Sequence, residues 1–176
     1  MKNKPSILQF IQKRLSALIP IGIALTVAGI ILFQLFAFFE PYLYPLHWLQ
    51  AKTRVVSTNI IVGAYPRETD LDTLKNKLHI TTVISLLNTP ELPQEKSLFE
   101  VEKKNCQASN LKVLNYPLNS DELDSKKTKW QINNIIKYID THKTERFYIH
   151  CYLGKHRAVE VENALISSHH LPPKNF

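Results

Sequence analysis

Short apolar runs alternate with amphipathic segments from residue 55 onward. The runs 59–62, 80–87, 111–118 and 146–150 predict strands, and 80–87 is nearly all apolar and β-branched, as in a strand buried on both faces. Apolar side chains recur at helical spacing in segments around 69–78, 93–109, 129–142 and 158–169, which predict helices. Strands separated by helices indicate an α/β fold, with a central, mostly parallel sheet flanked by helices. Such a sheet binds ligands at the carboxyl ends of its strands.

Two of the helices carry more specific expectations. Thr69 or Asp70 is expected to cap the helix that carries Leu71, Leu74 and Leu78 on one face. In the helix over 129–142, the positions at helical spacing are Trp130, Ile132, Ile135, Ile136 and Ile139.

A longer apolar segment precedes this domain. Residues 15–39 are 25 consecutive positions without a formal charge. This exceeds the roughly 20 residues that cross a bilayer core and predicts one transmembrane helix. A cleaved signal peptide is the alternative, but its apolar region would be shorter and would end in small residues, not in Phe-Ala-Phe-Phe. The chain then divides into a basic tail (1–14), the membrane helix (15–39), a linker (40–54), a domain (55–170) and a final tail (171–176).

The formal charge of +7 is concentrated at the start of the chain. Residues 1–54 carry +5 of it and the remainder only +2, so the excess brackets the apolar segment and nucleic acid is not expected as a partner. Four basic residues precede the segment and two follow it: Lys2, Lys4, Lys13 and Arg14, then Lys52 and Arg54. The positive-inside rule then predicts a single-pass membrane protein with a cytoplasmic N-terminus and the larger domain outside. That orientation places the domain outside the cytoplasm. A reactive cysteine thiol in the domain would be safer in a reducing compartment, so the two expectations conflict.

Residues 147–157 carry the candidate chemistry. An apolar strand leads into Cys151, a glycine and three potentially cationic side chains, and a helix follows. The backbone N–H groups of such a loop, with the positive end of a helix, form a concavity suited to an oxyanion. The same potential would stabilise a thiolate at Cys151. The planar guanidinium of Arg157 can bind two anion oxygens at once.

These residues resemble a known signature. His150-Cys151, five further residues and Arg157 are similar to the His-Cys-x5-Arg motif of cysteine-dependent protein tyrosine and dual-specificity phosphatases. The stretch 154–157, Gly-Lys-His-Arg, looks most like the atypical dual-specificity phosphatases of plants and fungi. Residues 59–66 and the elements up to 87 look like the opening of a compact dual-specificity phosphatase domain, so the resemblance covers about residues 55–168.

The resemblance implies hydrolysis of phosphate monoesters through a phosphocysteine intermediate, without a metal or other cofactor. In it, Cys151 is the nucleophile and Arg157 the phosphate clamp. His150 would support the loop and the thiolate by hydrogen bonding, and its alternative is an ordinary core histidine. The substrate-binding residues implied are Tyr152, Leu153, Gly154, Lys155, His156 and Arg157.

The general acid is expected in the loop after the strand 111–118. Asp121 and Asp124 are both candidates. Asp121 is favoured because it lies closer to the strand end and 30 residues before Cys151, which suits the family's usual separation. Asp124 precedes a helical stretch, so its more ordinary role is that of an N-cap.

Two residues after Arg157 depart from the family pattern. Ala158 stands where the family usually has a Ser or Thr whose hydroxyl helps the sulfur leave, and Val159 replaces a common Gly. These departures imply a slow enzyme or a pseudophosphatase that binds phosphorylated partners at the membrane.

Cys106 is interpreted as a plain helix-end cysteine, with a protective disulfide to Cys151 as the alternative. The expected substrates are a phosphorylated protein, a phosphoinositide or other lipid phosphate, or an inositol phosphate, and the oligomeric state stays open.

Overall fold

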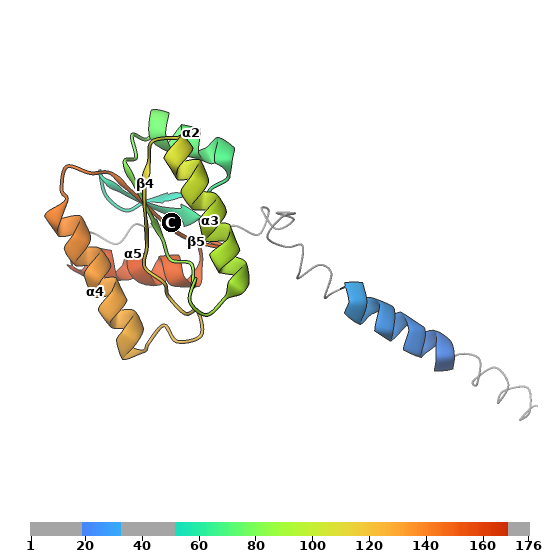
Figure 1. Cartoon of the computed structure of the whole chain (residues 1–176). Coiled ribbons are helices and arrows are strands. Elements are labelled where there is room, and N and C mark those ends of the chain that lie inside the picture. The colour runs from blue at the N-terminus through green and yellow to red at the C-terminus, as the bar shows by residue number, and fades with distance from the viewer. Residues whose placement is uncertain (1–18, 33–51, 169–176) are drawn as a thin grey trace, which may run out of the picture. The chain divides into compact units, whose positions relative to one another are not determined.

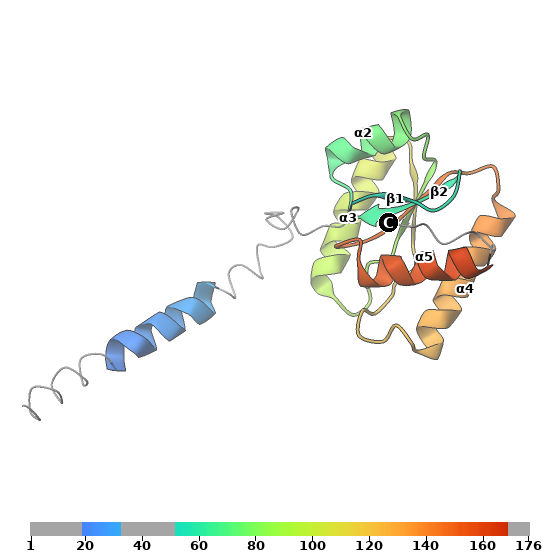
Figure 2. The same cartoon turned by 180° about the vertical axis from the view of Figure 1, so that it is seen from behind.

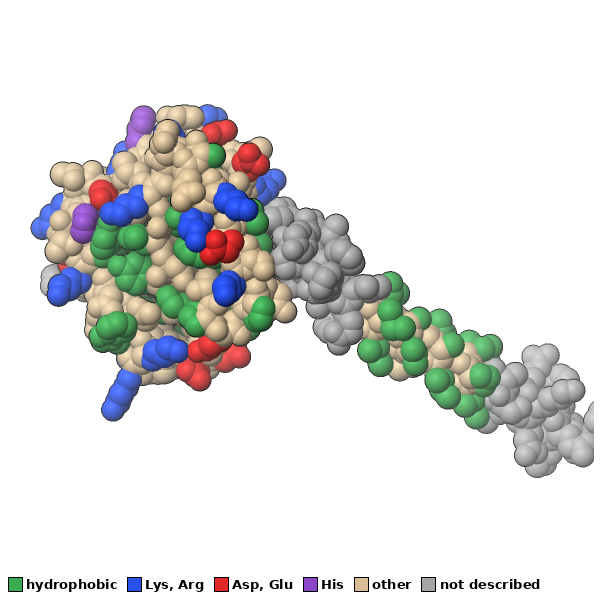
Figure 3. Space-filling model, in the orientation of Figure 1, with side chains coloured by type: hydrophobic (Ala, Val, Ile, Leu, Met, Phe, Trp, Pro, Cys, Tyr) green, Lys and Arg blue, Asp and Glu red, His purple; other side chains and the backbone are tan. Residues whose placement is uncertain are grey.

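The computed structural model describes residues 19–32 and 52–168, which fall in two separate units of the chain. Residues 19–32 form a helix whose side chains are all exposed, and most of them are hydrophobic in the space-filling view (Figure 3). Within the two described ranges, no helix has both the length and the apolar character to cross a bilayer. The transmembrane helix predicted over 15–39 therefore gains no support, and its ends lie outside the described residues.

The second unit is an α/β sandwich built on one five-stranded sheet (Figure 1). Its elements, in chain order, are β1 (Arg54–Val55), β2 (Ile60–Ala64), α2 (Glu68–Asn76), β3 (Thr82–Ser85), α3 (Pro93–Ala108), β4 (Lys112–Asn115), α4 (Lys126–Thr141), β5 (Phe147–Cys151) and α5 (His156–Ser168).

The strand order is β1-β2-β5-β3-β4. The pairs β2·β5, β5·β3 and β3·β4 are parallel, and only β1 runs antiparallel to its neighbour β2. The predicted mostly parallel sheet is thus confirmed. The short edge strand β1 was not predicted, and it begins within the segment assigned to a linker.

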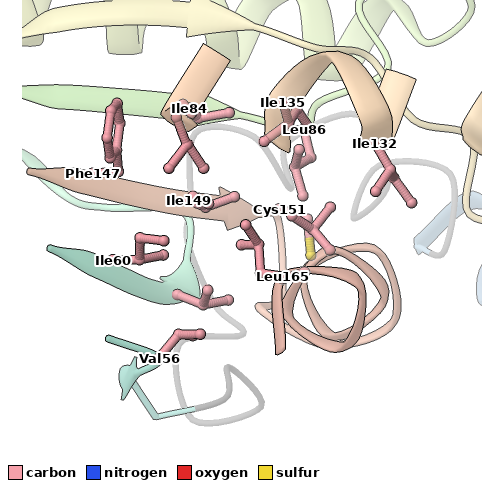
Figure 4. Close-up of a cluster of buried hydrophobic side chains, with 14 of the residues drawn as sticks. Val56, Ile60, Ile84, Leu86, Ile132, Ile135, Phe147, Ile149, Cys151 and Leu165 are labelled. Atoms are coloured by element: carbon pink, nitrogen blue, oxygen red, sulfur yellow. The ribbon is translucent and has the colours of Figure 1, made fainter. Parts of the chain in front are cut away.

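Two apolar clusters cover the two faces of the sheet. Figures 1 and 2 show the helices that pack on these faces, in two views related by a half-turn. The larger cluster packs α4 and α5 against alternate positions of the strands, including Phe147, Ile149 and Cys151 of β5 (Figure 4). The smaller cluster packs α2 and α3 against the opposite face, which Tyr148 reaches. Side chains alternate between the faces along a strand, so the neighbours His150 and Cys151 point to opposite layers.

Two local predictions are wrong. The N-cap of α2 is Arg67, not Thr69 or Asp70; Asp70 instead lies in the first turn and accepts the backbone N–H of Arg67 at 2.9 Å. Trp130 does not share the buried face of α4, because 63% of its surface is exposed while Ile132 is buried. The helical period was correct, but one position beside the apolar stripe was counted as part of it.

Candidate active site

Cys151 is the last residue of β5, in the middle of the sheet, and α5 begins five residues later at His156. The predicted order of strand, tight loop and helix is therefore found. We call residues 152–157 the phosphate loop. Gly154 in this loop has a φ of +68°, a left-handed conformation that favours glycine.

A hollow of about 320 Å³ opens at the carboxyl end of β5. Its lining comes from the phosphate loop and from the loop after β4: Ser120, Asp121, Cys151, Tyr152, Leu153, Lys155, His156 and Arg157. All the predicted substrate-binding residues except Gly154 line this hollow, and Gly154 is buried in the same loop. Lys155 and His156 are exposed at its rim, where the Lys155 ammonium adds positive potential.

The backbone N–H groups of residues 153–157 are available to a ligand. Within the part of the chain that the structure describes, none of them donates a hydrogen bond to the protein. The carbonyl groups of the loop are engaged instead: Tyr152 accepts from the N–H of Tyr65 at 3.2 Å, and Lys155 accepts from the N–H of Val159 at 3.1 Å. Carbonyls tied to the protein and free amides are the arrangement of a backbone anion site.

The Cys151 side chain is 3% exposed, and its sulfur lies 3.8 Å from the carbonyl oxygen of Lys155. Arg157 is buried in the same loop. Burial alone would lower the pKa of the Arg157 guanidinium, but the hydrogen bonds and charge of Glu95, helped by Cys151, raise that pKa above its ordinary value. The guanidinium therefore stays charged beside the thiol.

Glu95 is a site residue that the sequence analysis missed. Its two carboxylate oxygens accept from the two terminal nitrogens of Arg157 at 2.8 and 2.6 Å. Arg157 Nη1 also donates to the carbonyl oxygens of Leu86 and Leu118, at 3.1 and 3.3 Å. These contacts hold the Arg157 guanidinium near the carboxyl ends of β3 and β4. The only sequence signal was an acidic residue in the first turn of a helix, which is common in any helix.

The structure separates the two candidate acids. Asp121 lines the hollow, and its backbone N–H donates to Asn119 Oδ1 at 3.0 Å. Asp124 does not line it. The N-cap role predicted for Asp124 is also wrong, because Ser125 caps α4 by accepting the N–H of Thr128 at 3.1 Å.

His150 lies on the opposite face of β5 from Cys151 and is fully buried. Its Nε2 is 2.6 Å from Glu102 Oε1, and the other oxygen of Glu102 accepts from the Ser85 hydroxyl at 2.9 Å. The Nδ1 atom has no hydrogen-bond partner in the described part of the chain. His150 is therefore a core histidine held by a buried carboxylate, and the predicted hydrogen bond to the loop or the thiol is not found.

Cys106 is also a free thiol, fully buried in the apolar cluster under α2 and α3. Burial, together with the charge of Glu102, raises the pKa of this thiol to about 12. Cys151 belongs to the cluster on the other face of the sheet, so the two sulfurs are not paired. The disulfide alternative is excluded by this arrangement.

Comparison with known proteins agrees with this geometry. Residues 51–165 match the tyrosine phosphatase family. A candidate phosphatase of the DUF442 class from Shewanella putrefaciens CN-32 superposes with a TM-score of 0.58 at 17% identity, covering 77% of this chain and 80% of the other. Tk-PTP superposes with a TM-score of 0.50 at 17% identity, covering 67% and 72%. No curated protein sequence matches significantly. At these identities the structures show a shared fold alone.

A free thiol and a guanidinium lie in one anion-binding loop on an α/β sheet, which agrees with this family match. The match over 51–165 shows that the chain belongs to the tyrosine phosphatase family. Membership assigns it phosphatase activity on a phosphorylated substrate.

Proposed function

We propose that the protein hydrolyses phosphate monoesters through a covalent phosphocysteine intermediate on Cys151. The observation that carries the proposal is the phosphate loop itself. One hollow is bordered by the Cys151 thiol and the Arg157 guanidinium, and the N–H groups of residues 153–157 donate no hydrogen bond to any residue that the structure describes. Phosphoryl transfer asks mainly for in-line placement and stabilisation of charge, which these groups supply.

In the first step the Cys151 thiolate attacks phosphorus, and a sulfur–phosphorus bond forms as the bond from phosphorus to the leaving oxygen breaks. Asp121, across the hollow, gives its proton to that oxygen. In the second step the Asp121 carboxylate takes a proton from water, whose oxygen attacks phosphorus. The sulfur–phosphorus bond breaks, and inorganic phosphate and the thiolate are released. Arg157 and the loop N–H groups bind the three other phosphate oxygens throughout.

The proposed substrates are a phosphorylated protein, a phosphoinositide or an inositol phosphate. The exposed Lys155 ammonium at the rim favours a substrate with more than one negative charge near the reacting phosphate. The exposed apolar side chains of residues 19–32 and the uncharged run 15–39 support attachment to a membrane. Alkaline carbonate extraction of cell membranes tests the attachment, since a membrane-spanning protein stays in the pellet and a peripheral one is released.

A noncatalytic role is the second candidate. Ala158 is fully buried next to the loop and offers no hydroxyl to a departing sulfur. Without that hydroxyl, the loop could hold a phosphorylated partner without turning it over.

One experiment separates the two roles. The full chain is assayed with 4-nitrophenyl phosphate beside Cys151→Ser, which keeps the size of the side chain but replaces the thiolate. An enzyme that uses Cys151 loses about four orders of magnitude or more in kcat/KM in the variant. Binding of phosphate or tungstate without turnover by the wild type would favour the binder.

A further inference from the structure

Arg54 joins the N-terminal edge of the sheet to the phosphate loop. It belongs to β1, where it pairs with Val62 of β2. Its Nε donates to Glu162 Oε2 of α5 at 2.6 Å, and its Nη1 donates to the carbonyl oxygen of Gly154 at 3.2 Å. The side chain of Arg54 is 15% exposed and that of Glu162 is 6% exposed, so the pair is largely shielded from water. In the sequence, Arg54 is recognisable only as one of two basic residues that follow the apolar segment.

The contact with Gly154 fixes one peptide unit of the loop. A peptide bond is planar and trans, so its C=O and N–H point in opposite directions. When Arg54 holds the Gly154 carbonyl on the outer side of the loop, the N–H of Lys155 in the same peptide must point the other way. Lys155 lines the hollow, and within residues 19–32 and 52–168 its N–H donates no hydrogen bond to the protein.

The loop is also seated tightly at this point. A Cβ atom on Gly154 would lie 2.7 Å from the backbone N of Ala64 and from the carbonyl carbon of Gly63, at the end of β2. Two residues earlier in the loop, the Tyr152 carbonyl oxygen accepts a hydrogen bond from the N–H of Tyr65. Gly154 therefore rests against β2 on one side, while the guanidinium from β1 holds its carbonyl oxygen.

The positive charge of Arg54, like its position, favours anion binding by the Lys155 N–H. A cation bonded to a carbonyl oxygen polarises the peptide and makes its N–H a stronger donor. Glu162 holds Arg54 in place from α5, so the guanidinium is anchored on one side and directed at the loop on the other.

We propose that Arg54 is a positioning residue of the phosphate loop: anchored by Glu162, it holds the Gly154 carbonyl so that the Lys155 N–H faces the bound oxyanion. This inference rests on the proposed function only in that the loop must bind a tetrahedral oxyanion. It extends the site to Arg54, which lies one residue before the predicted domain.

The test is equilibrium binding of tungstate to the full chain by isothermal titration calorimetry, which needs no turnover. Arg54→Met is expected to weaken tungstate binding about tenfold, the usual effect of losing one charge-assisted contact. Arg54→Lys keeps a cation for the ion pair with Glu162, but a lysine ammonium cannot contact Glu162 and the Gly154 carbonyl oxygen in the way that the planar guanidinium does. Its affinity for tungstate is expected to lie between those of the wild type and Arg54→Met. Arg67→Met is the matched control, since Arg67 also pairs with a carboxylate, Asp70, but does not border the hollow.

A second readout separates positioning from general damage. The rate of Cys151 alkylation by iodoacetamide is measured against pH, and its midpoint should move upward in Arg54→Met but not in Arg67→Met. Tungstate binding equal to wild type in Arg54→Met would overturn the role of Arg54. Should Arg54→Met fail to fold, Arg54→Lys and Glu162→Gln decide, and wild-type binding in both would overturn it. No tungstate binding by the wild type would instead overturn the proposed function.

Discussion

Replacing Glu95 by Gln should destabilise the protein by about 3 kcal/mol. The two terminal nitrogens of Arg157 each donate to a Glu95 oxygen, and the two side chains are only 9% and 12% exposed. Leaving one member of a buried ion pair without its partner costs about 3–5 kcal/mol. The lower end applies here because the carbonyls of Leu86 and Leu118 still accept from the guanidinium, which also borders the hollow.

Activity should change in a different pattern from stability. The Gln side chain removes a negative charge near the phosphate dianion, so KM should not rise. Arg157 loses one of its two hydrogen bonds to residue 95, which help to orient the guanidinium toward the transition state, so kcat should fall about tenfold, equivalent to about 1.4 kcal/mol. Urea denaturation followed by circular dichroism, with steady-state kinetics on an aryl phosphate, measures both quantities.

The matched control is Glu100→Gln on the same helix, where the carboxylate pairs with Lys103 at the surface. Its pair is about half exposed, so stability and kcat should stay at the wild-type values. The account of Arg157 would be refuted if Glu95→Gln lost less than about 1 kcal/mol of stability with an unchanged kcat.

Three further results are expected. Asp121→Asn should remove the dependence of kcat on an acidic group while Asp124→Asn leaves it intact, and the reverse outcome in pH-rate profiles would assign the acid to Asp124. Ala158→Ser should speed breakdown of the phosphoenzyme several-fold, which rapid-quench kinetics would detect as a smaller burst of product. An unchanged burst would contradict the role of this hydroxyl in helping the sulfur to leave. Because burial raises the pKa of Cys106 to about 12, the folded protein keeps this proton longer than the unfolded chain. Its contribution to stability is therefore full below about pH 8.5 and is lost as the pH rises toward 12, at up to about 1.4 kcal/mol per unit; Cys106→Val should flatten the alkaline part of the stability profile, and an equal slope in both proteins would contradict this.

The sequence was most informative where chemistry and spacing coincide. Cys151, the glycine and Arg157 lie within seven residues, so their proximity follows from the chain itself and the hollow around them could be anticipated. The parallel order of the strands followed equally from apolar runs separated by helices. Such local patterns survive folding because the backbone alone brings the groups together.

Contacts between segments that lie far apart in the chain could not be predicted from the sequence. Glu95 reaches Arg157 across 62 positions, and Arg54 reaches Gly154 across 100. Nothing in a helix-start glutamate or in a basic residue after an apolar segment indicates such a partner. The period of β5 does predict that His150 and Cys151 face opposite layers, and applying it would have removed the expected contact between His150 and the thiol.

The central claim is that phosphate passes through the sulfur of Cys151. Acid quenching of the full chain during turnover of an aryl phosphate, followed by peptide mass spectrometry, tests it most directly. The account predicts one phosphate on the peptide that contains Cys151, accumulating because Ala158 gives no help to the second step, and none in Cys151→Ser. Steady hydrolysis by Cys151→Ser, or phosphate carried on any other residue, would contradict it.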